Sequence, residues 1–377
     1  MKFLHVSDLH LGKRLHETSF IEDQAEILNQ ILNVVDDEKP NGILIAGDVY
    51  DKSVPSAEAV SLFDAFLAQL ANRKVKTFVI SGNHDSPERI AFGSKIMDAS
   101  GIYLSPVYDG TVTPIRLQDD FGEVNVYLLP FIKPAHVRRF YEDEEITSYT
   151  DAMKVAIAHM FVDESARNIL VSHQFVTGGV RSESEENVGG TDNVDVTVFE
   201  PFDYVALGHL HAPQNCGEKV RYCGTPLKYS FSEVAHEKSI TVVTLGKKGD
   251  DLDLRTIPLK ATRDMQKIKG SFAQLTSPDY YTNNPMVDAY LQITLTDEDD
   301  IPDAMARLQE IYRNALDLRY DNARTKADAV VDGGEISVEK SAYELFAEFF
   351  EQQNNVEMTP AQQDYMQKLI QTIKEGV

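Results

Sequence analysis

Aspartate, asparagine and histidine residues recur just after short apolar segments in this sequence. The apolar segment 42–46 is followed by Asp48, and the segment 3–6 is followed by Asp8 and His10. Short apolar runs of this kind are typical of buried parallel strands. Because open α/β folds bind their ligands at the carboxyl ends of the strands, we expect these side chains to share one polar site with Asp48 at its centre.

Three later apolar segments end in residues of the same kind. They are 77–80, followed by Asn83, His84 and Asp85; 168–171, followed by His173; and 203–207, followed by His209 and His211. Each motif alone is weak, since a single buried histidine is most often a hydrogen-bonded core residue. Five such strand ends in succession are difficult to explain by packing, so the sequence predicts a metal site.

The residue types narrow the chemistry of this site. The predicted ligands are Asp8, His10, Asp48, Asn83, His173, His209 and His211. This mixed nitrogen and oxygen set excludes calcium and suits manganese, iron or zinc better than magnesium. It exceeds what one such ion usually takes from a protein, whereas two ions that share Asp48 would use every donor. Two ions about 3.5–4 Å apart are typical of enzymes that hydrolyse phosphoesters.

The elements that would position these residues alternate between strands and helices, which predicts a layered α/β domain. Amphipathic helices are expected over about 19–35, 56–72 and 149–159. Further along the chain we expect a strand over 290–295 and helices over 302–318, 341–352 and 360–374. The predicted domains are a metallophosphoesterase domain over 1–262, a small α/β cap with a linker over 263–340, and a helical tail over 341–377.

The composition limits the partners of the chain. Its 377 residues carry a formal net charge of −24, and a uniformly acidic surface repels nucleic-acid phosphates. The two cysteines, Cys216 and Cys223, lack metal-type or redox-type spacing and are expected to be reduced packing residues. We find no signal peptide and no membrane span, so a soluble cytoplasmic protein is expected.

Together the five motifs resemble those of the calcineurin-like metallophosphoesterase superfamily, over about residues 1–245. The resemblance implies two metal sites that share Asp48. Asp8, His10, Asp48 and His211 would hold one ion, and Asp48, Asn83, His173 and His209 would hold the other.

The same resemblance implies roles for two residues beside the metals. His84 would face the phosphate, where it would protonate the leaving oxygen or stabilise the developing charge. Asp51 occupies the position where some relatives have a carboxylate that orients this histidine, and a loop-capping role is the alternative. Asp85 is more typical of a turn or supporting residue than of a ligand.

Three further stretches resemble the SbcD family, the nuclease subunits of bacterial SbcC–SbcD complexes. They are 182–191, 221–233 (continued by Lys238 and Ser239) and 343–350. The resemblance implies a manganese-dependent DNA nuclease of repair and recombination. It would act as a 3′→5′ exonuclease on double-stranded ends and as an endonuclease on single strands and hairpins.

Other functions of the same superfamily remain to be compared. Cyclic-nucleotide phosphodiesterases share the five motifs but usually lack the additional domain and the stretch 221–233. A protein serine/threonine phosphatase is disfavoured because Asp51 is followed by Lys52 and Ser53 instead of arginine and glycine. A catalytically inactive scaffold is disfavoured because every predicted ligand is present.

The resemblance also implies partners: DNA, an SbcC-type coiled-coil ATPase, and a second copy of the chain in a homodimer within a heterotetramer. Bound metal ions and basic residues would offset the acidic charge near the DNA. Candidates for phosphate contact are Lys13, Arg14, Arg89, Lys133, Arg138, Arg139 and Lys228. The apolar stripes of the tail suit binding to a groove of SbcC, and packing on the chain's own core is the alternative.

Overall fold

The structure is a computed structural model that describes residues 1–180, 193–282, 284–322 and 358–374, together with 343, 346, 347 and 350. The chain divides into two compact units. The larger comprises Met1–Lys267, Asn284–Gln292 and Tyr312–Asp317, and the smaller comprises Ile268–Asn283, Ile293–Ile311 and Leu318–Val377. No helix in the described ranges is long and apolar enough to cross a membrane.

The first sheet of the larger unit has six strands in the order β14-β13-β1-β4-β5-β6. Their bounds are β14 Asp253–Pro258, β13 Ser239–Thr244, β1 Lys2–Val6, β4 Gly42–Ala46, β5 Lys76–Ile80 and β6 Ile102–Leu104. β1, β4, β5 and β6 run parallel. Their carboxyl ends therefore meet at one edge, as the motifs after β1, β4 and β5 require.

The second sheet has the order β11-β12-β10-β9-β8-β7. Its strands are β11 Gln214–Asn215, β12 Val220–Tyr222, β10 Tyr204–Gly208, β9 Arg167–His173, β8 Gly122–Leu128 and β7 Ile115–Asp119. β8, β9, β10 and β12 are parallel to one another. The histidine motifs after β9 and β10 thus lie at a common edge of this sheet.

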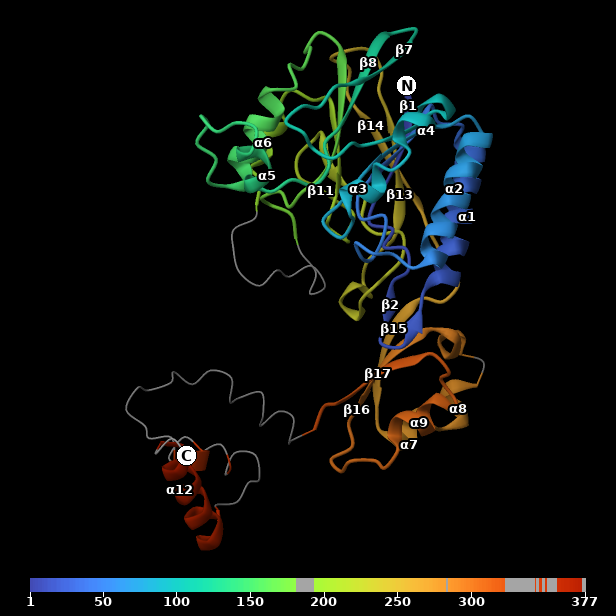
Figure 1. The fold of residues 1–377 in the computed structure, drawn as a ribbon. Helices are drawn as coiled ribbons and strands as arrows, with labels where there is room; N and C mark the ends of the chain where they lie inside the picture. Colours follow the sequence, from blue (N-terminus) through green and yellow to red (C-terminus); the bar gives the residue numbers. More distant parts are fainter. Residues whose placement is uncertain are drawn as a thin grey trace. The chain divides into compact units, whose positions relative to one another are not determined.

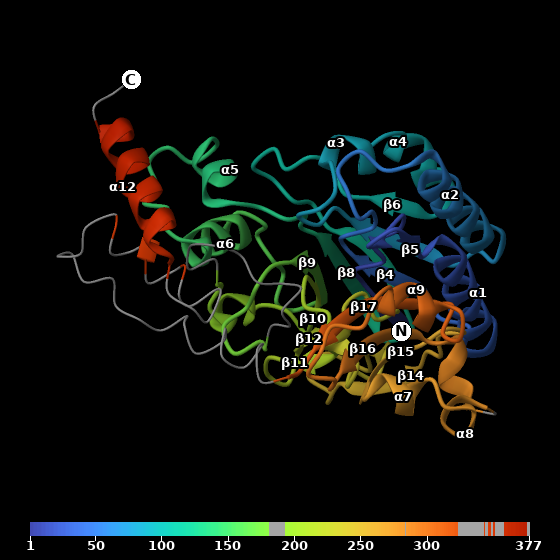
Figure 2. The same cartoon turned by 90° about the horizontal axis from the view of Figure 1, so that it is seen from below.

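The two sheets pack face to face, and helices cover their outer faces (Figures 1 and 2). Alternate residues of one strand serve different layers: Leu44 belongs to the core between the sheets, whereas Ile43 and Ile45 belong to the core beneath the helices. The first sheet is covered by α1 (Ile21–Glu38) and α2 (Ala57–Asn72). The second is covered by α6 (Tyr149–Ala158), with α5 (Pro134–Arg138) beside it. The predicted layered α/β fold is confirmed.

Short elements complete the larger unit. They are the paired strands β2 Arg14–Leu15 and β3 Thr18–Ser19, the helices α3 Pro87–Ile90 and α4 Ser94–Met97, and the 3-10 turns η1 Asp98–Ser100, η3 Val196–Phe199, η4 Phe231–Glu233 and η5 Pro285–Asp288.

A third sheet of the chain has the order β15-β16-β17. Its strands are β15 Met265–Gly270, β16 Tyr290–Leu295 and β17 Ala315–Tyr320.

The prediction of one helix over 302–318 is wrong in its second half. The helix α9 spans only Ala304–Gln309, and residues 315–320 form strand β17. Leu316, Leu318 and Tyr320 alternate with Asp317 and Arg319, which is the period of a strand. The smaller unit also contains α7 (Phe272–Leu275) and α8 (Pro278–Tyr281).

The tail is described only in part. The helix α12 spans Pro360–Lys374, as predicted from the sequence. Most of the other predicted tail helix, 341–352, lies outside the described residues, as do residues 323–340 of the predicted cap and linker and the stretch 182–191. The three-domain division made from the sequence stays a prediction.

Candidate metal centre

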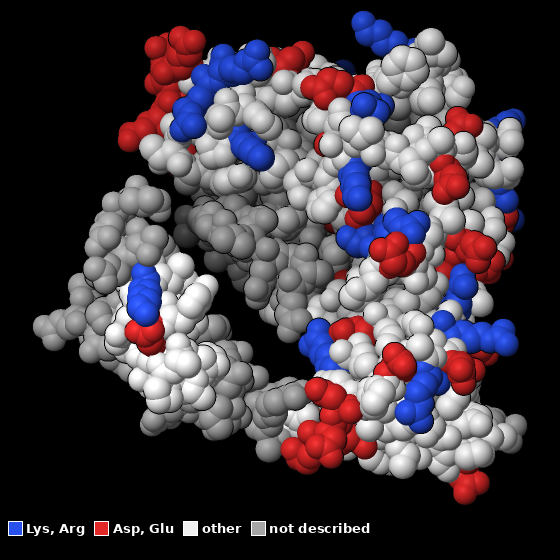
Figure 3. All heavy atoms as spheres, turned by 60° about the horizontal axis from the view of Figure 1, so that its bottom comes forward, with Lys and Arg blue, Asp and Glu red and all other residues white. Residues whose placement is uncertain are grey.

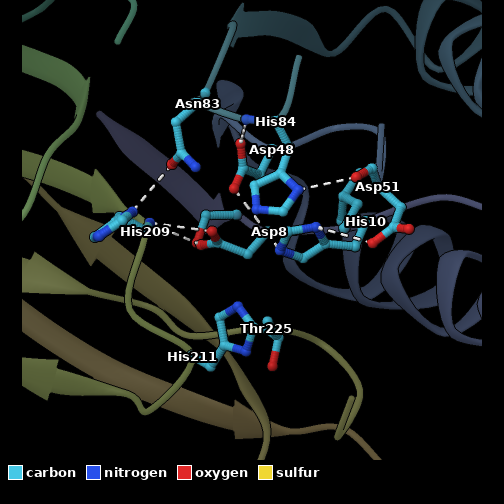
Figure 4. Close-up of polar contacts among 12 residues, drawn as sticks. Asp8, His10, Asp48, Asp51, Asn83, His84, His209, His211 and Thr225 are labelled. Atoms are coloured by element: carbon cyan, nitrogen blue, oxygen red, sulfur yellow. Dashed lines mark hydrogen bonds and ion pairs between the residues drawn. The ribbon is translucent and has the colours of Figure 1, made fainter. Parts of the chain in front are cut away.

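The polar residues that follow β1, β4, β5 and β10 lie together in one site (Figure 4). His173, the last residue of β9, joins them through its contacts with Asp48 and Asn83. In the figure Asp8, His10, Asp48, His209 and His211 surround a common centre, with Asn83 and His84 next to Asp48. Both sheets contribute, because the sandwich brings their strand ends to the same place.

Four of the residues at this centre have unusual backbone geometry. Asp8, His10, Asp48 and His209 have φ values of 52°, 44°, 46° and 107°. Residues other than glycine seldom adopt positive φ, and such strain is concentrated at functional sites. The local backbone is thus held by the surrounding structure in conformations that aim these side chains inward.

Glycine is required where two of the loops approach one another. A Cβ on Gly82 would lie 2.1 Å from Oδ1 of Asp48, and one on Gly208 would lie 1.9 Å from the carbonyl oxygen of Ala46. Any side chain at either position would push the strand ends apart. These glycines explain why the motifs have the form Gly-Asn-His-Asp and Gly-His-x-His.

The first group of side chains corresponds to one predicted metal site. Ligand atoms of Asp8, His10 and His211 all lie within 4.8 Å of one another, and all three residues are buried. Neither ring nitrogen of His10 makes a hydrogen bond in the structure. Burial lowers the pKa of His10 well below its usual value, so the ring is a neutral donor of the kind that binds metal ions.

The second group contains Asp48, Asn83, His173 and His209. Oδ1 of Asn83 lies 2.9 Å from Nε2 of His173 and 3.0 Å from Nδ1 of His209. Asp48 lies between the two groups, with Oδ2 3.4 Å from Nε2 of His173 and 3.7 Å from Nε2 of His10. This intermediate position fits the predicted bridging role of Asp48.

The electrostatics show that the centre favours a positive charge. Burial opposes the protonation of His173, but the Asp48 and Asp8 carboxylates outweigh it and raise its pKa to about 9. Burial raises the pKa of Asp8 to about 6, because its negative charge is poorly solvated. Buried carboxylates need a cationic partner, so Asp8 and Asp48 fit divalent cations.

His84 lies beside this group with its main-chain nitrogen donating to Oδ1 of Asp48 at 2.9 Å. Its Nδ1 atom lies 2.9 Å from the main-chain carbonyl oxygen of Asp51. A carbonyl can only accept, so Nδ1 carries the proton of that hydrogen bond. The ring is exposed and lies against His10, with 4.8 Å between the ring centroids.

The expectation that the carboxylate of Asp51 orients His84 needs correction. The main-chain carbonyl makes that contact, while Oδ1 of the carboxylate lies 2.8 Å from Nζ of Lys13 and 3.9 Å from Nδ1 of His10. The turn after β4 directs the side chain toward the loop that follows β1. Asp51 thus orients His84 through an atom that every residue type possesses.

Asp85 has a supporting role, as the sequence indicated. Its carboxylate accepts hydrogen bonds from the main-chain nitrogens of Val49, Tyr50 and Gly82, at 3.1, 2.9 and 2.9 Å. These contacts tie the loop after β4 to the loop after β5 and so fix the distance between Asp48 and Asn83.

Two supporting groups were not predicted from the sequence. Oε1 of the fully buried Glu233 lies 2.9 Å from Nδ1 of His211, and Lys238 donates to Oε2 of Glu233 at 2.7 Å. Tyr229 donates to the carbonyl of Leu9, and its ring lies 5.7 Å from that of His10. Tyr229, Glu233 and Lys238 belong to the stretch 221–239, whose resemblance to the SbcD family was the available signal.

Comparison with known proteins gives matches over most of the chain. Residues 1–213 match the family model described as calcineurin-like phosphoesterase, and residues 261–354 match SbcD_C, described as type 5 capsule protein repressor C-terminal domain. A protein of Staphylococcus epidermidis, named as the D component of the nuclease SbcCD, is 35% identical over 324 residues, which cover 84% of this chain and 85% of the relative. The chain belongs to the SbcD family. The resemblance inferred from the motifs is thereby confirmed.

A second SbcD-family relative gives the same result. The protein of the same name from Staphylococcus saprophyticus is 34% identical over 324 residues, which cover 84% of each chain. Among solved structures, a dimetal phosphatase from Danio rerio matches with a TM-score of 0.43 and 11% identity, over 70% of this chain and 99% of that one. As a member of the SbcD family, the chain is a calcineurin-like phosphoesterase.

Proposed function

We propose that this chain is a two-metal DNA nuclease that hydrolyses phosphodiester bonds in DNA repair and recombination. The observation that carries the proposal is the position of Asp48 between two groups of metal-type donors, in a chain of the SbcD family. The relatives are named nucleases, which favours DNA over a cyclic nucleotide as the substrate.

Asp8, His10, Asp48 and His211 would hold one divalent ion, and Asp48, Asn83, His173 and His209 the other. The mixture of imidazole and oxygen donors suits Mn²⁺, Fe²⁺ or Zn²⁺, and the resemblance to the SbcD nucleases favours Mn²⁺ among them. When bound, a pair of such ions supplies an activated water and stabilises negative charge on the phosphate. The buried carboxylates and imidazoles of the chain would fix the positions of both ions before the substrate arrives.

His84 would act on the leaving group. With Nδ1 engaged by the carbonyl of Asp51, Nε2 is the nitrogen from which a protonated ring can donate. The exposure of the ring gives a phosphate direct access to it. We therefore assign His84 as the general acid that protonates the leaving oxygen, or as the group that stabilises its charge.

A nuclease with so many acidic residues needs positive charge near its active site, because its negative net charge repels DNA phosphates. Figure 3 shows Lys and Arg side chains distributed among Asp and Glu on the face drawn. Some predicted phosphate contacts have partners within the chain: Lys13 pairs with Asp51, Lys228 with Asp264, and Arg138 with the carbonyl of Ile146. The bound ions would supply most of the attraction at the reacting phosphate.

The function of the complex would depend on partners. We propose that the chain acts with an SbcC-type coiled-coil ATPase, to which the tail binds, and as a homodimer within a heterotetramer. Phe92, between α3 and α4, and Ile96, within α4, are 83% and 81% exposed, and a second copy would cover these apolar residues. Ile96→Asp should then yield monomers in sedimentation, whereas Phe161→Asp, at an 84% exposed phenylalanine, should not.

The decisive experiment uses linear duplex DNA labelled at either end. The purified chain is incubated with Mn²⁺ or Mg²⁺, with and without SbcC, and a hairpin, a single strand and a cyclic nucleotide are tested in parallel. Release of the 3′ label first, with manganese preferred, is expected. Hydrolysis of the cyclic nucleotide alone would replace the nuclease assignment by a small-molecule phosphodiesterase.

A further inference from the structure

A cavity of about 260 Å³ is lined by residues of α3 and of the segment around α5. Three aromatic side chains line it, namely Tyr108, Phe131 and Phe140, and the polar lining includes Glu88, His136 and Arg139. Its volume is below the range of about 300–1,000 Å³ that drug-sized ligands occupy. A single flat ring system therefore suits it better than a whole dinucleotide.

The cavity adjoins the candidate metal centre. The ring of Phe131 contacts the ring of His173 edge to face, with 6.3 Å between the centroids. The main-chain nitrogen of Phe131 donates to the carbonyl of Ser81 at 2.9 Å, just before the loop that carries Asn83 and His84. Glu88 follows the same loop. A group seated here would thus be held next to the residues that contact the reacting phosphate.

The side chains of the cavity suit a nucleobase. Nζ of Lys133 lies 6.0 Å from the centroid of Phe131, so a cation stands beside the aromatic wall. Tyr108 and Phe140 pack edge to face, with 5.9 Å between their centroids. Proteins that hold single strands commonly combine such aromatic faces for the bases with nearby cations for the phosphates.

A phosphate is a poorer occupant than a base. Glu88 is the carboxylate in the lining, and hydrogen bonds from its own main-chain nitrogen and from Ser86, the latter at 2.8 Å, hold its pKa below the usual value. Its negative charge would repel a phosphate, whereas an exocyclic amino group of a base could donate to it. Arg139 of the lining and Lys133 beside it would then contact the backbone phosphates of the same strand.

We infer that this cavity takes one unstacked nucleobase of the DNA strand whose phosphate lies at the metal centre. The inference rests on the proposed nuclease function and adds to it the residues that select the substrate. A base must leave its stack to enter such a cavity, and this costs least in a single strand, a hairpin loop or a frayed end. The preference for those substrates would then be built into the active site of the chain itself.

The test combines a protein variant with a DNA variant. Single-stranded oligonucleotides carry one abasic position, which is moved stepwise past the cleavage site. At the position that faces the cavity, removal of the base should lower kcat/KM of the natural chain roughly tenfold, which is the scale of one base–aromatic stack. Phe131→Leu should cause a similar loss on intact DNA and almost no further loss on that abasic strand.

Two controls accompany this cycle of protein and DNA variants, which compares the two single changes with their combination. Manganese content is measured for Phe131→Leu, because the ring also packs against His173. Phe161→Ala, at an exposed ring outside the cavity, should keep the full dependence on the base. The same cycle is measured as binding affinity in a His84→Gln background, so that the cavity is tested even where cleavage is not observed.

The outcomes separate the inference from the proposed function. One outcome is that the chain does not cleave DNA, but its affinity for DNA depends on the base and Phe131→Leu removes that dependence. This would overturn the nuclease assignment and support the nucleobase site in the cavity. The nucleobase site would be overturned if the losses in kcat/KM from Phe131→Leu and from the abasic position multiply when the two changes are combined. It would also be overturned if no abasic position changes kcat/KM. Either result would leave the nuclease assignment unaffected.

Discussion

Nδ1 of His211 lies 2.9 Å from Oε1 of Glu233, a carboxylate that is fully buried. The other carboxylate oxygen of Glu233 accepts a hydrogen bond from Nζ of Lys238. The same Nζ also donates to the carbonyl oxygen of His211 at 2.9 Å and to the hydroxyl of Thr225 at 2.6 Å. Nδ1 of His211 is therefore the protonated nitrogen, and Nε2 carries the lone pair that can bind a metal ion. A carboxylate behind a ligating histidine fixes its tautomer and orientation.

Glu233→Gln should weaken metal binding without removing any ligand. An amide can still accept from His211, but it no longer balances Lys238, and supporting residues of this kind typically contribute about 10–100-fold in metal affinity. Calorimetric titration of Mn²⁺ into the metal-free protein measures the effect. Glu237→Gln, at a neighbouring exposed glutamate, is the matched control. An unchanged affinity of Glu233→Gln for Mn²⁺ would show that the contact between Glu233 and His211 does not support metal binding.

Asp48→Ala should remove both ions. The substitution withdraws the carboxylate that lies between His10 and His173, and leaves two cations facing each other without a shared anion. Metal content per chain, measured by mass spectrometry after dialysis, should fall from two ions toward none. Asp64→Ala, at an exposed position on α2, should keep both. Two retained ions would exclude the bridging assignment.

His84→Gln should separate chemistry from metal binding. Glutamine can hydrogen-bond to a phosphate oxygen but cannot protonate the leaving group, and general acid catalysis is typically worth about 10²–10⁴-fold in rate. We expect turnover of DNA to fall by that amount while manganese content stays normal. If the variant instead loses an ion, His84 is a ligand and not an acid.

Glu38 should make the stability of the fold depend on pH in the acid range. Hydrogen bonds from Arg255 and Lys2 lower the pKa of Glu38 from 4.5 to about 2. Because the folded-state pKa is depressed, the stabilisation is present above pH 4.5 and is lost as the pH falls toward 2. Glu38→Gln should cost about 1 kcal/mol at neutral pH. The difference from the natural chain in chemical denaturation should disappear near pH 2, and a constant difference would contradict the assignment.

Truncation after Lys340 should separate nuclease activity from partner binding. The part of the tail that the structure describes includes α12, in which Tyr365 and Leu369 are 66% and 40% exposed. The truncated chain should retain manganese-dependent cleavage of short DNA and lose co-purification with SbcC. Aggregation or unfolding of the truncated chain would instead show that the tail completes the chain's own core.

The strand ends were predictable from the sequence because parallel strands buried on both faces leave continuous apolar runs. β4 and β16 have the predicted bounds, 42–46 and 290–295. β17 was missed because its Leu316 and Leu318 also fit a helical pattern that begins at α9. Over such short distances the two periods overlap, and only pairing within the sheet decides between them.

The supporting contacts of the site could not be predicted in the same way. Glu233 reaches His211 across 22 residues, and Tyr229 reaches Leu9 across 220. Neither pairing leaves a periodic signal, because each depends on how distant loops pack. The correction at Asp51 has a similar cause: the contact uses a main-chain carbonyl, which the identity of the residue does not reveal.

The positive φ angles of Asp8, His10, Asp48 and His209 lower the stability of the fold, and these conformations are retained because the function needs the side chains there. Glycine at any of these positions would relieve backbone strain while deleting a donor of the centre. A library of variants selected for thermal stability alone should therefore accumulate glycine here and lose catalysis, whereas selection for DNA cleavage should restore the original residues. Opposing selection of this kind marks the centre as a place where stability and activity are traded against each other.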